Sequence, residues 1–258
     1  VYRDVAIDSY YGDAASVINY PISNTSWAAP QKSDADYQVA YSLDVDGNPL
    51  YTDDMTDDEK FAAATQAALG FFEAAGYTVE NGKVTAAPEG AKMTYEIIIG
   101  ADGSGDHPSF AILTDAKAAL ESIGFTLEIN DVTDSNIMWD ALNAGTAEMW
   151  AAAWQATVDP DMYQVYHSAS VKSNYYHIND ETLDQDIIDA RSTADQEYRK
   201  SVYKQCLDII LDWAVEIPIY QRQNCVIYSP ERINADTFTK DVTTFYPWYG
   251  DIINIEMN

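Results

Sequence analysis

The sequence is poor in basic residues. It has 14 Lys and Arg against 42 Asp and Glu, which gives a net charge of −28 at pH 7. Binding to nucleic-acid phosphates or to anionic lipid headgroups needs clusters of Lys and Arg, so neither is expected as a partner. We interpret the excess acid as a solubility surface. The alternative is that it steers cationic ligands toward the protein.

Cysteine and histidine are scarce. The two cysteines, Cys206 and Cys225, lack the spacing of metal ligands, and two residues alone do not establish a disulfide. The three histidines, His107, His167 and His177, show no paired spacing such as i, i+4. The sequence therefore predicts neither a metal site nor a cofactor.

Long hydrophobic runs are also missing. No stretch approaches the roughly 20 apolar residues of a membrane span. The first residues lack the basic start and apolar run of a signal peptide, and there is no initiating Met. We expect a processed or excised piece of a longer chain, which reaches a membrane only through the parent protein's anchor.

Catalytic motifs are absent as well. Ser104 stands between two glycines without the Gly-x-Ser-x-Gly spacing of a nucleophile elbow, and the same glycines lack the Lys of a phosphate-binding loop. A calcium-loop start at Asp44 fails because Pro49 and Met55 occupy the positions that need Gly and Glu. We predict a protein that is not an enzyme. A hydrolase with a carboxylate-based site is an alternative, although no acidic pair stands out.

The chain is rich in apolar and aromatic residues. Its 258 residues are 47% hydrophobic and include 19 Tyr and 6 Trp, enough for one large domain or two modest ones. A disordered chain would contain fewer aromatic residues. Tyr and Trp combine apolar area with a polar group, which suits both packed cores and ligand sites.

The first third of the chain predicts a helix over residues 1–20 and a hairpin over 37–51 with its turn at Asp46-Gly47. A second helix is predicted from Asp57 to Ala75. Thr56 and Glu59 form the capping box that begins it, and Gly76 ends it.

The middle of the chain alternates between two periodicities. Apolar runs at residues 93–100, 125–132 and 147–154 predict strands, and 109–122 and 135–143 predict helices. This order predicts an α/β fold, a mostly parallel or mixed sheet flanked by helices. Ligands bind such sheets at the carboxyl ends of the strands, which include residues 154–161.

The last third predicts two helices and then extended chain. The helices run from Asp180 or Thr182 to about residue 192, and from about residue 195 to 213. Residues 216–228 are predicted to form an extended pair. An aromatic cluster follows at residues 245–249.

Several of these segments resemble one family. The run from Gly145 to Asp161, with Trp154 and the Asp159-Pro160 turn, resembles a signature of the extracellular solute-binding protein family 5. That family includes the oligopeptide- and dipeptide-binding proteins of ABC importers. The opening residues 3–8, Asn174-Tyr175, residues 199–213 and the Ile-Pro-Ile-Tyr run at 217–220 are also similar to it.

The resemblance implies a periplasmic-binding-protein type II-like lobe. Residues 1–258 would form the C-terminal, second lobe of a two-lobed protein whose first lobe is largely absent, with residues 240–258 returning toward that lobe. The implied function is capture of peptides or related small solutes by hinge closure. The implied partners are the ligand and an ABC importer permease, for a monomer located outside the cytoplasm, in the periplasm or as a cell-surface lipoprotein. A non-catalytic interaction scaffold is the other alternative.

The resemblance also names candidate ligand-binding residues. Trp154 matches a cleft Trp and Tyr220 an aromatic residue after the Ile-Pro strand, and Trp139 is a candidate second cleft Trp. Peptide binders of the family place an Asp where this chain has Thr157, so Asp159 or Asp161 is expected to substitute. The basic residues that bind a peptide carboxylate in the family have no counterpart here, where Leu142, Asn143 and Ala151 stand. For Trp154, the alternative is a core residue.

Overall fold

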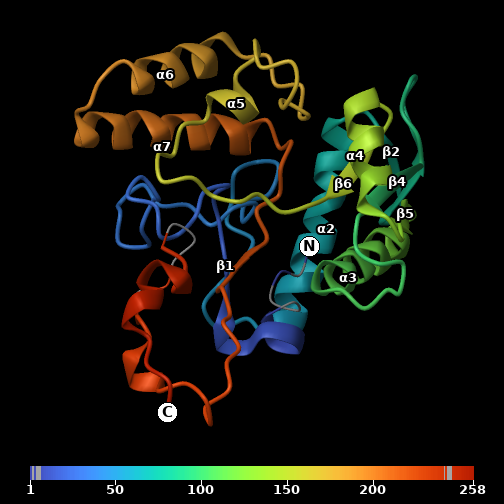
Figure 1. Cartoon of the computed structure of the whole chain (residues 1–258). Helices are drawn as coiled ribbons and strands as arrows, with labels where there is room; N and C mark the ends of the chain where they lie inside the picture. Colours follow the sequence, from blue (N-terminus) through green and yellow to red (C-terminus); the bar gives the residue numbers. More distant parts are fainter. Residues whose placement is uncertain (2, 4–6, 241, 243–245) are drawn as a thin grey trace.

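The computed structural model describes residues 1, 3, 7–240, 242 and 246–258. Two groups of elements lie side by side in Figure 1. A sheet unit contains β4, β5 and β6 with α2, α3 and α4, and a helical unit contains α5, α6 and α7. Strand β1 lies below the helical unit and to the left of the sheet unit in the view. None of the helices among the described residues is both long and apolar enough to cross a membrane.

The sheet unit has the predicted parallel arrangement. Strands β4 (Thr94–Ile99), β5 (Thr126–Asp131) and β6 (Met149–Ala151) lie in the order β5-β4-β6, and both pairs are parallel. Helices α3 (Pro108–Ser122) and α4 (Ser135–Ala144) make the crossovers. The predicted α/β class, with helices flanking the sheet, is confirmed.

Local signals fix the helix ends in this unit. Helix α2 (Asp57–Ala74) begins with the predicted capping box, in which Thr56 and Glu59 exchange hydrogen bonds. Helix α4 ends at Gly145, whose φ of 67° is a conformation that glycine adopts without steric cost.

A hairpin that the sequence analysis did not predict covers one end of the unit. Strands β2 (Thr78–Glu80) and β3 (Lys83–Ala86) pair antiparallel around Asn81-Gly82, whose φ angles are 55° and 73°. Asn-Gly is the two-residue hairpin signal, so the sequence did carry the information. Val84 is buried against Leu69 of α2 and Ile123.

The helical unit holds the largest core. It consists of α5 (Tyr163–Tyr166), α6 (Glu181–Arg191) and α7 (Gln196–Asp212). The long helices agree with the prediction, whereas the single turn of α5 was not predicted. Their fully buried side chains are Leu183, Ile187, Ala190, Tyr203, Cys206, Leu207 and Ile210. Cys206 and the exposed Cys225 are both free thiols, so they form no disulfide.

The predicted helix over residues 1–20 is confirmed only in part. Ile7–Tyr11 (η1) is a short π-helix and Gly12–Ala14 (η2) a 3-10 helix, but Ala15–Val17 is strand β1, where the prediction is wrong. Positions 4–6, on which part of that prediction depended, lie outside the described residues. The physical reason is the antiparallel ladder between β1 and β7 (Tyr220–Arg222), which satisfies backbone groups that a helix would pair internally.

Other extended segments are also shorter than predicted. Residues 216–228 do not pair with one another, because β7 pairs with β1 instead. The hairpin over 37–51 is reduced to one bridge, Leu43 with Pro49, around a turn held by the Asp44 side chain. Among the described residues near the C-terminus, Ala235–Thr237 (η3) and Trp248–Asn254 (η4) are 3-10 helices, and Ile233 forms an antiparallel bridge with Met257. Phe245, part of the predicted aromatic cluster, lies outside the described residues.

Candidate functional site

The candidate site lies where the chain leaves the sheet unit for the helical unit, between β6 and α5 (Figure 1). Strand β6 ends at Ala151, three residues earlier than predicted, so Trp154 belongs to the irregular segment that follows. Its side chain is 48% exposed, which excludes the alternative of a core residue. The indole Nε1 donates a hydrogen bond to the hydroxyl of Tyr176 at 3.0 Å.

Three stacked rings connect the two units beside Trp154. Trp150 of β6 stacks on Tyr176 with ring centroids 5.4 Å apart, and Tyr176 stacks on Tyr166 of α5 at 5.6 Å with the planes 8° apart. We call these residues the aromatic stack. Because Tyr176 is held on both faces, the acceptor of the Trp154 bond has a fixed position.

A carboxylate lies at the end of the aromatic stack. The half-buried side chain of Glu216 accepts a hydrogen bond from the Tyr166 hydroxyl at 2.7 Å, and the Tyr176 hydroxyl also lies near it. Burial raises the pKa of Glu216, and the two hydroxyls oppose that rise. The same burial and the nearby carboxylate raise the pKa of Tyr166 and Tyr176. Tyr41 donates to the backbone carbonyl of Glu216 at 2.7 Å.

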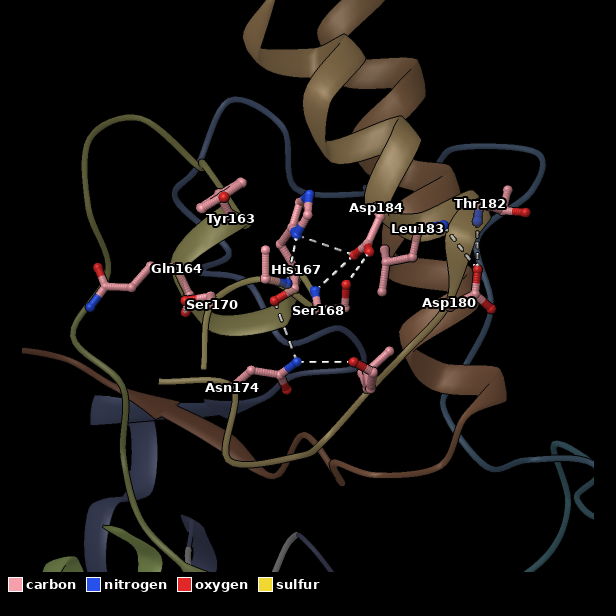
Figure 2. Close-up of polar contacts among 12 residues, drawn as sticks. Tyr163, Gln164, His167, Ser168, Ser170, Asn174, Asp180, Thr182, Leu183 and Asp184 are labelled. Atoms are coloured by element: carbon pink, nitrogen blue, oxygen red, sulfur yellow. Dashed lines mark hydrogen bonds and ion pairs between the residues drawn. The ribbon is translucent and has the colours of Figure 1, made fainter. Parts of the chain in front are cut away.

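A polar network holds the loop that carries Tyr176 (Figure 2). The backbone N–H of Ser168 donates to Asp184 of α6 at 2.8 Å, and its hydroxyl donates to the same carboxylate. The buried Asn174 donates its amide to the carbonyls of His167 and Ile178, at 3.4 and 3.0 Å. The Ser168 bonds join the start of the loop to α6, and the Asn174 bonds link the middle of the loop to residues near its two ends, on either side of Tyr176.

The same network brings a Ser, a His and an Asp together without the geometry of a catalytic triad. The Ser168 hydroxyl donates to Asp184 rather than to an imidazole nitrogen. Nδ1 of His167 accepts from the backbone N–H of Ala169 at 3.0 Å and lies 3.4 Å from Asp184. A triad needs an imidazole within hydrogen-bond reach of the nucleophile, and the bonds of Ser168 go to Asp184 instead.

Metal binding gains no support from the residues that the structure describes. Among them, no three His, Cys, Asp or Glu side chains gather closely enough to hold an ion.

The predicted acidic ligand-binding residues are engaged within the chain. Asp159 binds Arg199 of α7, whose Nη2 lies 2.7 and 3.0 Å from the two carboxylate oxygens. Asp161 pairs with Nε of Arg191 at 3.3 Å and accepts from the Tyr163 backbone N–H at 3.0 Å. Both carboxylates therefore attach the crossing segment to the helical unit. In this structure their charges are already matched by cations.

The other predicted residues lie around Trp154 without joining it. Thr157 donates its hydroxyl to the Asp159 carbonyl at 2.5 Å, which shapes the turn. Trp139 of α4 packs against Tyr175 at 6.2 Å. Tyr220 of β7 packs against Tyr11 at 5.4 Å and has its hydroxyl 3.4 Å from Ser109. Within the described part of the chain, no hydrogen bond or ring contact connects Trp139 or Tyr220 to Trp154. Burial raises the pKa of Tyr220 to about 12.

Glu216, Tyr166 and Tyr176 were not predicted from the sequence as residues of the site. Glu216 carried a signal, because it interrupts the apolar run from Val215 to Ile219, and charged residues in such runs are rarely buried without a reason. The two tyrosines carried none, since their stacking depends on how the loop folds.

The comparisons with known proteins concern the fold. No protein-family model matches the sequence, and the search of curated proteins finds no match. Among solved structures, the whole chain matches 45% of the oligopeptide-binding protein AppA from Bacillus subtilis, with 16% identity and a TM-score of 0.68. NikZ from Campylobacter jejuni, solved with Ni(L-His), matches 86% of the chain over 40% of its own length, at 18% identity and a TM-score of 0.62.

A third similar structure is the periplasmic binding protein DppA from Helicobacter pylori, solved with the peptide STSA. It matches 99% of the chain over 41% of its own length, at 17% identity and a TM-score of 0.57. The chain thus spans less than half the length of these proteins. At such identities the likeness establishes the fold alone: this chain has the α/β fold found in part of these binding proteins.

Proposed function

We propose that this chain is the second lobe of a two-lobed solute-binding protein, which delivers a small solute or peptide to an ABC importer permease. Residues 240–258 would return toward the first lobe. Full proteins of this fold recorded with a nonapeptide, a nickel–histidine complex and a tetrapeptide support a binding role rather than a catalytic one. We further propose a location outside the cytoplasm, since similar proteins are described as periplasmic.

The observation that carries the proposal is the exposed indole of Trp154. It follows the carboxyl end of a parallel strand, the edge where α/β sheets bind ligands. The hydrogen bond to Tyr176 already fixes the orientation of the Trp154 ring before a ligand binds. A ligand that packs on the exposed ring face therefore costs little further side-chain entropy. In the proposed mechanism a solute lies against this face, and the two lobes close around it by a hinge motion.

Trp154 is proposed as the main ligand contact, with Thr157, Tyr220 and Trp139 as residues that the closed form would bring to the solute. Asp159 and Asp161 are each paired with an arginine. We propose that either carboxylate can bind a solute only if its ion pair with that arginine breaks first. Those ion pairs hold the crossing segment, so we expect both to contribute mainly through the shape of the site.

Native mass spectrometry tests the proposal directly. The two-lobed protein, purified and then incubated with a mixed peptide library, is expected to retain a stoichiometric small mass that is released on unfolding. Turnover of the library without retained mass would favour a hydrolase, and a stable complex with a protein but no small solute would favour a scaffold. Either result would reject the proposed function.

A further inference from the structure

Among the residues that the structure describes, no cation forms an ion pair with the carboxylate of Glu216. It is half-buried between Val215 and Ile217, and its carboxylate oxygen accepts from Tyr166 at 2.7 Å. No Lys, Arg or His in the described ranges forms an ion pair with it, whereas Asp159 and Asp161 each have an arginine partner. Burying a carboxylate that has no cation partner costs folding free energy. Such a group in a folded protein is therefore a candidate for a functional role.

The hydroxyl of Tyr176 connects this carboxylate to Trp154. It accepts the indole N–H at 3.0 Å, which leaves its own proton free to be donated. The carboxylate of Glu216 lies near this hydroxyl, and burial together with that carboxylate raises the pKa of Tyr176. A hydroxyl that donates to a charged acceptor becomes a better acceptor itself, so the charge of Glu216 strengthens the Trp154 bond. The stacked rings of Trp150 and Tyr166 prevent Tyr176 from turning away.

We propose that Glu216 is a positioning residue which, through Tyr176, holds the indole of Trp154 in the orientation in which it meets a ligand. This role rests on the proposed function, because only there does Trp154 touch a solute. It adds a residue from the segment before β7, 62 positions away along the chain, to the control of the site. Solute affinity would then depend on the charge of a group that the solute does not touch.

Few other groups near Glu216 can titrate. Tyr166 from α5 and Tyr176 from the loop face its carboxylate, and Tyr41 faces its backbone carbonyl. Arg3 donates to the carbonyl of Pro218, two residues further on. The phenols ionise well above neutral pH and the guanidinium stays charged, so a change at mildly acidic pH belongs to Glu216.

Side-chain NMR tests the proposal without any ligand. The six indole N–H resonances of the ¹⁵N-labelled chain are recorded between about pH 4 and pH 8, the range that contains raised Glu pKa values. A Trp154→Phe variant assigns the resonance of interest. We expect this resonance to shift with a single titration in the unaltered chain, to lose that titration in Glu216→Gln, and to move without titrating in Tyr176→Phe.

The matched control is Glu231→Gln, which removes an exposed carboxylate elsewhere and should leave the titration unchanged. A Trp154 resonance that does not move with pH, or that titrates identically in Glu216→Gln, would overturn the proposal. If Glu216→Gln fails to fold, the Tyr176→Phe variant is sufficient as the test. A Trp154 resonance that still titrates in Tyr176→Phe would show that the effect of pH does not reach Trp154 through Tyr176, and would overturn the proposal. The result is independent of solute binding, so it distinguishes failure of this inference from failure of the proposed function.

Discussion

At the residue scale, Glu216 makes the stability of the protein depend on pH in an unusual direction. Its pKa is raised in the folded protein, so the folded state keeps this proton at pH values where the unfolded chain has already lost it. The contribution of Glu216 to stability is therefore most favourable below the ordinary Glu pKa of about 4.3, and it falls as pH rises through the folded pKa.

Glu216→Gln removes that titration. We predict that the free energy of unfolding of the variant, minus that of the unaltered chain, increases from acid to neutral pH, as measured by urea denaturation at several pH values. Glu231→Gln should show no such increase. Parallel pH profiles for Glu216→Gln and the unaltered chain would contradict the raised pKa.

A glycine in the sheet unit gives a second test at this scale. Gly124 has a φ of 88°, and a Cβ there would lie 2.6 Å from the Val84 carbonyl oxygen of the hairpin. Gly82 has a φ of 73° with open space around it, so it is the matched control. We predict that Gly82→Ala costs roughly 1–2 kcal/mol from backbone strain. Gly124→Ala should cost about 1–3 kcal/mol more, because the hairpin must also move. Equal losses in denaturant unfolding would refute the close packing.

The two cysteines differ enough to report on the helical core. Cys206 is fully buried in α7, and burial raises its pKa to about 12, whereas Cys225 is exposed. Since the thiolate is the reactive form, we predict that a thiol reagent labels one cysteine in the native chain and two after unfolding. In the Cys225→Ser variant, Cys206 is the remaining thiol. If it is labelled in the native state as fast as in the unfolded chain, Cys206 is accessible to solvent and the packed core is contradicted.

At the scale of elements, two aspartates test how the ends of the long helices are fixed. Asp195 caps α7 through the backbone N–H groups of Glu197 and Tyr198. Asp180 caps α6 in the same way and also accepts the indole N–H of Trp213, at the end of α7, at 3.0 Å. We predict that Asp195→Ala costs about 1 kcal/mol of stability, and that Asp180→Ala costs more because it loses a second bond. A smaller loss for Asp180→Ala in thermal unfolding would contradict this arrangement.

The elements also show what a sequence can reveal. Helices α2 and α4 were predicted almost to their ends, because the capping box at Thr56 and the glycine at 145 act within a few residues. Strand β1 was not, because its partner β7 lies some 200 residues further along the chain, so no local pattern specifies the pair. The same limit applies to the site. Trp154 was predicted from a local run, but its partner Tyr176 and the nearby Glu216 are contributed by other segments of the chain.

At the scale of the whole molecule, the aromatic stack joins the sheet unit to the helical unit. The chain spans 45% of the similar AppA structure, so in the proposed function the first lobe supplies the other wall of the ligand site. We predict that the 258-residue chain alone binds a solute at least tenfold more weakly than the two-lobed protein, a difference of about 1.4 kcal/mol. Equal affinities in calorimetric titrations would reject the two-lobe account.

The central claim is that Trp154 contacts the solute, and NMR titration of the ¹⁵N-labelled chain with a mixed peptide library tests it most directly, because it detects weak binding. The account predicts saturable shifts that include the Trp154 indole. These shifts should be lost in Trp154→Ala and kept in Trp213→Ala, a control that removes another exposed, hydrogen-bonded Trp. Absence of saturable shifts in the unaltered chain, or unchanged shifts in Trp154→Ala, would contradict it.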